Sequence, residues 1–253
     1  IVDSKTFILF PLINSIDVYE NSSENISYQW QTLSGIEDFS YETQLDSNLV
    51  FSSIISLDDN SLIVAGWQKQ TANNYDLIIK KINSLTGNTI SEKVIDTSDF
   101  TNIDIGNRPN LVSLSENNYL VSWSDNLNNN AIIFDKYNNT LHQYSILEPD
   151  AVDFTPVINF DGTITFIWGK YSDGSISSIQ LDSNLSAWSW SDVKTIGSGL
   201  FSNSYSLDAI PLSNENYIIL FPYDDNASIN YIVVDGSNHS ALMQVSAPFT
   251  DAE

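Results

Sequence analysis

The chain has 253 residues, 42% of them hydrophobic, which is enough apolar material for a sizeable buried core. It carries 32 acidic against 9 basic residues, and the resulting net charge of −23 disfavours nucleic acids and anionic membrane surfaces as partners. There is no cysteine, which excludes disulfides, thiolate nucleophiles and cysteine-bound zinc.

The chain begins with Ile1 rather than Met, so we expect it to be part of a longer polypeptide. No apolar run approaches the length of a membrane span, and we expect no membrane insertion.

Short apolar segments that end in an aromatic residue recur at intervals of about 45 to 57 residues. Each of the last four follows a shorter strand and a tight turn rich in Asp, Asn and Gly, which tolerate the left-handed dihedrals of hairpins. A polar loop, a third strand and a more polar fourth strand come next. The segments are 6–10, 62–67, 119–123, 164–168 and 217–221, and they end in Phe10, Trp67, Trp123, Trp168 and Phe221.

This repeat predicts an all-β protein, a β-propeller of five four-stranded antiparallel blades. The first two strands of each repeat are apolar almost throughout, which indicates burial on both faces. In the strands of a two-sheet sandwich, apolar and polar residues would alternate instead. We expect one domain with blades at residues 6–45, 51–96, 108–147, 154–197 and 205–245.

The first repeat lacks a strand before Thr6, the start of its aromatic-ended segment. If residues 246–253 supply that strand, the five blades close into a ring. The alternative is closure by residues outside this sequence.

Two stretches carry a resemblance to known proteins. Pro109–Trp123 and Pro156–Trp168 resemble the blades repeated in large secreted bacterial surface proteins and adhesins. Ala187–Phe221 resembles, more weakly, the repeat of bacterial sugar-binding propellers, which have a W-x-x-W-x-x-x-G-G signature. Here the glycines are spaced as Gly197-Ser-Gly199, in a single copy. The resemblance implies an extracellular or cell-surface location and a binding role.

In an up-and-down blade, the loops after the second and fourth strands share one end, which we call the loop-rich end. The tight hairpins occupy the other. Ligands of propellers usually bind where long loops converge. Carboxylates beside tyrosine rings suit the hydroxyls and faces of sugars. Arg108, the sole arginine, either pairs with local carboxylates or binds a carboxylate of the ligand. The candidate ligand-binding residues are Asp125, Tyr171, Asp173, Tyr223, Asp224 and Arg108.

Three functions remain open from the sequence. The favoured one is a binding or adhesion module for a carbohydrate or protein; the others are a non-catalytic structural spacer of a larger surface protein and a five-bladed glycoside hydrolase. A hydrolase needs two carboxyl groups that flank the scissile bond. Acidic residues available for that role are Asp125, Glu148, Asp153, Asp173 and Asp224, but no signature singles out a catalytic residue.

No cofactor is predicted. Calcium is weighed only for loop carboxylates, because no calcium-binding loop motif occurs in the sequence. The carboxylates considered for a shared ion are Asp99, Glu148, Asp150 and Asp153.

Overall fold

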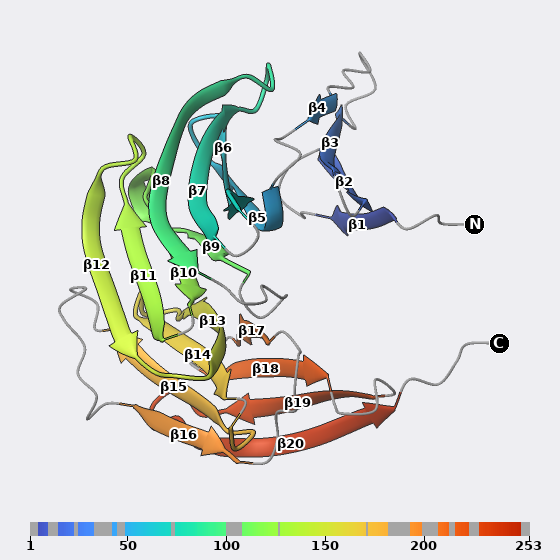
Figure 1. The fold of residues 1–253 in the computed structure, drawn as a ribbon. Helices are drawn as coiled ribbons and strands as arrows, with labels where there is room; N and C mark the ends of the chain where they lie inside the picture. Colours follow the sequence, from blue (N-terminus) through green and yellow to red (C-terminus); the bar gives the residue numbers. More distant parts are fainter. Residues whose placement is uncertain are drawn as a thin grey trace. The chain divides into compact units, whose positions relative to one another are not determined.

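The computed structural model of the chain describes residues 5–9, 15–22, 25–32, 42–44, 49–71, 74–99, 108–125, 127–170, 172–181, 193–198, 207–212, 216–222 and 228–248. The chain forms two compact units, Ile1–Asp99 and Phe100–Glu253, which we call the N-terminal and C-terminal units. Both units consist of four-stranded antiparallel sheets (Figure 1).

The N-terminal unit contains two sheets, each with its strands paired in chain order. The first sheet consists of β1 (Lys5–Leu9), β2 (Ser15–Ser22), β3 (Asn25–Thr32) and β4 (Glu42–Gln44). The second sheet consists of β5 (Leu49–Leu57), β6 (Ser61–Lys69), β7 (Asn74–Asn83) and β8 (Thr89–Asp99).

The first sheet corrects the expectation that its repeat lacks a strand. Segment Lys5–Leu9 is the first strand of the sheet and pairs with Ser15–Ser22, which in turn pairs with β3. The sequence pattern missed β2 because Asp17 and Glu20 interrupt it, so it lacks the continuous apolar run of the other second strands.

The C-terminal unit contains three more sheets of the same kind. The third consists of β9 (Asn110–Ser113), β10 (Tyr119–Ser124), β11 (Asn128–Phe134) and β12 (Thr140–Leu147), and the fourth of β13 (Ala151–Ile158), β14 (Ile164–Lys170), β15 (Ile176–Leu181) and β16 (Lys194–Gly197). The fifth consists of β17 (Asp208–Pro211), β18 (Tyr217–Pro222), β19 (Ser228–Val234) and β20 (Ala241–Pro248).

The end of β20 bears on how residues 246–253 are used. β20 continues to Pro248 as the partner of β19, with Ser228 opposite Pro248. Residues 246–248 therefore lengthen the fourth strand of the last sheet and do not supply a first strand to another. Residues 249–253 lie outside the described part of the chain.

The aromatic residues at the ends of the second strands are buried, as the repeat predicts. Trp67, Trp123, Trp168 and Phe221 are 0–3% exposed. The last three each occupy the fifth position of β10, β14 or β18. Phe10, which the repeat also predicts at the end of a second strand, instead follows the first strand β1 and lies outside the described residues.

The fourth sheet shows why its strands are apolar on both faces. One face packs against the third sheet through a cluster that includes Phe154, Phe166 and Trp168. The other face packs against the fifth sheet through Val157 and Ile167. Sheets stacked face to face in this way are the blades of a β-propeller.

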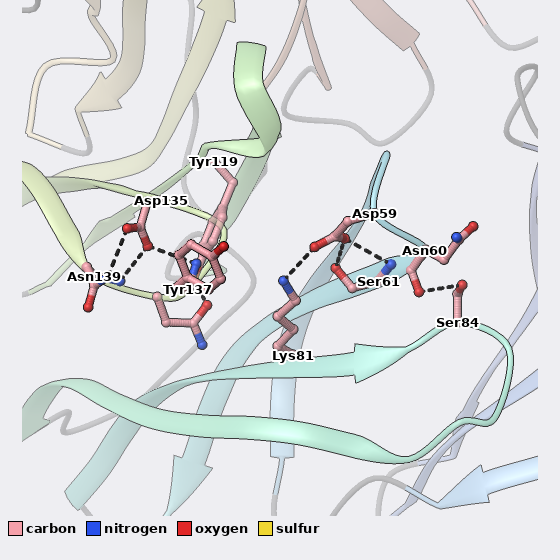
Figure 2. Close-up of polar contacts among 10 residues, drawn as sticks. Asp59, Asn60, Ser61, Lys81, Ser84, Tyr119, Asp135, Tyr137 and Asn139 are labelled. Carbon is pink, nitrogen blue, oxygen red and sulfur yellow. Dashed lines mark hydrogen bonds and ion pairs between the residues drawn. The ribbon is translucent and has the colours of Figure 1, made fainter.

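In several hairpins an aspartate of the turn accepts hydrogen bonds, as at Asp59 and Asp135 (Figure 2). Asp59 accepts from the backbone N–H of Ser61 at 3.2 Å and from Lys81 Nζ at 2.9 Å. Asp135 accepts from the backbone N–H groups of Tyr137 and Asn139 at 2.8 and 2.9 Å. Such turns account locally for many of the acidic residues. In the described part of the chain, no helix is of a length and hydropathy that would span a membrane.

Candidate functional site

The predicted site residues that the structure describes lie at strand ends of the C-terminal unit. Asp125 follows β10, Asp173 lies between β14 and β15, and Arg108 precedes β9. Among the described residues, no hydrogen bond or ion pair joins these three to one another. The other predicted residues, Tyr171, Tyr223 and Asp224, lie outside the described part of the chain.

Asp125 holds its own loop together. Its Oδ1 accepts hydrogen bonds from the backbone N–H groups of Leu127 and Asn128, both at 2.7 Å. Its Oδ2 accepts from Asn130 Nδ2 at 2.9 Å. The carboxylate therefore fixes the path of the chain from β10 into β11.

Asp173 is exposed and also serves a turn. Its Oδ1 accepts from the backbone N–H of Ser175 at 2.9 Å. Hydrogen bonds from the Ser175 side chain and backbone lower the pKa of Asp173, so this carboxylate stays ionised at neutral pH. The same arrangement, in which a hydroxyl group two residues further along donates to the aspartate, recurs in the pairs Asp161–Thr163 and Asp235–Ser237.

Another carboxyl, which sequence analysis placed in a loop, lies inside β13. Asp153 sits where the pairing of β13 with β14 shifts between Val152 and Thr155. Its φ of 57° is in the left-handed region, and its side chain is fully buried. At a β-bulge, a residue in this conformation points its side chain in a different direction from a residue in a regular strand.

The Asp153 carboxyl connects three successive sheets of the C-terminal unit at their first strands. Its Oδ2 accepts a short hydrogen bond from the backbone N–H of Leu207, directly before β17. Its Oδ1 lies 3.4 Å from Asn110 Nδ2 at the start of β9. The Asn110 amide also donates to the carbonyl of Phe154 at 3.3 Å.

The surroundings of Asp153 make its ionisation costly. Burial raises the pKa of Asp153 to about 7, and the neighbouring Asp208 adds to this effect. Arg108 and the hydrogen bonds from Asn110 and Leu207 lower the pKa of Asp153, but they do not offset the larger effect of burial. Asp153 therefore carries a proton for part of the time at neutral pH.

Arg108 is close enough to Asp153 to influence its charge, yet among the described residues no ion pair joins the two. The side chain of Arg108 is partly exposed, and its Nε is buried. In the part of the chain that the structure describes, this Nε has no hydrogen-bond partner. We call Arg108, Asn110, Asp153, Thr155 and Asp208 the inner-strand site, because they lie at or next to the first strands of three sheets.

Glu148, a second candidate acid, forms an ion pair. Its Oε1 lies 2.5 Å from Nζ of Lys170, at the end of β14, and the glutamate is largely buried. No three His, Asp or Glu side chains of the described residues gather into a group that would hold a metal ion. The shared calcium ion considered for Glu148, Asp150 and Asp153 thus finds no ligand cluster among these residues.

Sequence reasoning also missed a buried polar cluster in the fourth and fifth sheets. His239 Nδ1 lies 3.0 Å from both Ser178 Oγ and Tyr217 Oη. Burial lowers the pKa of His239, which favours the neutral imidazole. Ser178 is fully buried, and its contact with His239 connects the fourth and fifth sheets.

No protein-family model and no curated protein matches the chain. Solved structures do match, and they show the class of the fold, a β-propeller, in agreement with the stacked sheets.

Three of these structures illustrate the range of propellers. The WD40 domain of Toxoplasma gondii coronin has a TM-score of 0.55 at 6% identity and covers 93% of this chain. A polysaccharide lyase, the PL25 ulvan lyase, has a TM-score of 0.59 at 8% identity and covers 96% of this chain and 68% of its own. The exo-β-1,3-galactanase of Phanerochaete chrysosporium has a TM-score of 0.53 at 10% identity and covers 98% of this chain. This chain spans 57% of the coronin chain and 66% of the galactanase chain.

Proposed function

We propose that this chain is a ligand-binding module of a secreted or cell-surface protein, with a carbohydrate or protein ligand at the loop-rich end of the C-terminal unit. The observation that carries the proposal is the buried Nε of Arg108, which has no partner within the described part of the chain. Arg108 is a partly exposed residue, and a guanidinium has five N–H donors, so a ligand oxygen at this position can accept hydrogen bonds from those that the protein does not engage.

The state of the acidic residues favours binding over glycoside hydrolysis. Hydrolysis needs two carboxyl groups that reach the substrate. Asp153 has a raised pKa suited to a general acid, but it is fully buried. Glu148 is paired with Lys170, while Asp125 and Asp173 are engaged in turns. The similar solved structures share 6–10% identity and support the fold alone, so the proposal depends on this site.

A glycan array with and without calcium tests the proposal. The wild-type chain is expected to bind a defined set of glycans, and Arg108→Gln to lose that signal while keeping the thermal midpoint of unfolding. Asp161→Ala, which alters a hairpin turn at the opposite end of the fourth sheet, is the matched control and is expected to bind like wild type. A structural spacer predicts no signal for any variant, and that outcome on the glycan array and on a matched protein array would overturn the proposal.

A further inference from the structure

The charge balance around Arg108 extends the proposed function. We propose, resting on that function, that Arg108 binds a carboxylate and that the ligand is therefore an acidic carbohydrate, one that contains a uronic acid.

The first step is that no ion pair engages Arg108 within the described part of the chain. The charge of Arg108 influences the Asp153 carboxyl, but among the described residues no ion pair joins the two. The oxygens of Asp153 instead face the backbone N–H of Leu207 and the side chains of Asn110 and Thr155. Arg108 is a partly exposed residue, and the Asp153 oxygens leave its donors to a ligand.

The second step concerns the local charge. The titratable and charged groups identified around the Asp153 carboxyl are Arg108, next to β9, and Asp208, on β17. When Asp153 is protonated, the positive charge of Arg108 is not neutralised by this buried neighbour. A planar guanidinium is the side chain best matched to a carboxylate, because its donors form a fork of the same geometry.

The third step selects among anions. A polyphosphate needs several cations, and a chain of net charge −23 with 9 basic residues repels it. A uronic acid has one carboxylate, which a single arginine can match, and several hydroxyl groups. Asp208 is the exposed acidic residue of the inner-strand site, and its carboxylate is an acceptor for such hydroxyls.

Calorimetric titration with two matched sugars tests the inference: methyl β-D-glucuronide and its neutral isostere methyl β-D-glucoside. At pH 6 the wild-type chain is expected to bind the glucuronide about tenfold more tightly than the glucoside. Arg108→Gln is expected to abolish that preference. Lys136→Gln removes a cation from a hairpin turn of the third sheet and is expected to keep it.

The pH dependence provides a second readout. Raising the pH from 6 to 8 ionises Asp153 beside Arg108, and the affinity for the glucuronide is expected to fall, since the sugar carboxylate is ionised throughout this range. In Asp153→Asn the neighbouring group cannot ionise, and most of this pH dependence is expected to be lost. An affinity that does not change between pH 6 and 8 in the wild type would count against the arrangement.

The outcomes separate this inference from the proposed function. Equal affinity for both sugars, or binding of neutral glycans alone, overturns the inference and leaves a carbohydrate-binding module. Binding of an N-acetylated peptide through its terminal carboxylate, without binding of the glucuronide, overturns the acidic sugar but retains a carboxylate-binding Arg108. No binding of any glycan or protein overturns both.

Discussion

Asp153 accepts a hydrogen bond from the backbone N–H of Leu207, a residue 54 positions further along the chain. The bond joins the first strand of the fourth sheet to the residue that precedes the first strand of the fifth. A titratable group therefore lies inside a contact between sheets, and the stability of the C-terminal unit is expected to depend on pH.

The sign of that dependence follows from the pKa of Asp153, which rises from 3.8 to about 7 on folding. The folded protein binds more protons than the unfolded chain between these values. The free energy of unfolding is expected to decrease as the pH rises from about 4 to about 7, by at most about 1.4 kcal/mol per pH unit from this group. Asp153→Asn should remove most of that slope, as measured by urea unfolding at pH 5 and 8. Asp173→Asn, an exposed control, should keep the slope, and an unchanged slope in Asp153→Asn would contradict the assignment.

Trp168 is fully buried between the third and fourth sheets. Trp168→Ala is expected to destabilise the protein by about 3–5 kcal/mol, because the surrounding sheets cannot close the cavity. Phe160 is 67% exposed in a turn of the same sheet, and Phe160→Ala should change stability by less than about 0.5 kcal/mol. Chemical denaturation of the two variants checks the difference, and similar losses in both would argue against burial between blades.

The ion pair of Glu148 and Lys170 can be tested by a double-mutant cycle. Lys170→Met leaves a largely buried carboxylate without its cation and is expected to cost about 1–3 kcal/mol. Adding Glu148→Gln should recover part of the loss, because the remaining side chain is neutral. Additive effects of the two substitutions would show that the pair does not contribute to stability.

The chain is expected to release no sugar from arabinan, fructan or xylan in a reducing-end assay. The physical reason is that the candidate acids that the structure describes are engaged elsewhere: Asp125 and Asp173 in turns, Glu148 in an ion pair and Asp153 in a buried contact. Turnover that disappears when one loop carboxylate is replaced would establish the hydrolase instead.

The repeat was predictable because burial on both faces leaves a continuous apolar run, as in β10 and β14, each ending near a tryptophan. The turns were predictable from local chemistry, and Gly162 indeed adopts a φ of 82°. The environment of Asp153 was not predictable, since its partners come from strands far apart in sequence. The one local signal was that an acidic residue, Asp153, interrupts the apolar segment Val152–Val157. The predicted blade began at residue 154 and therefore did not include Asp153.

Because the fourth sheet packs against another sheet on each face, one of its faces stays exposed during synthesis until the fifth sheet has been made. When residues up to 206 have left the ribosome, the third sheet can cover one face, but the face with Val157 and Ile167 still lacks Tyr217 and Phe221. A nascent chain at that length presents an apolar surface that chaperones recognise. A fragment that ends before Leu207 is therefore expected to bind a hydrophobic dye strongly, whereas the complete chain does not.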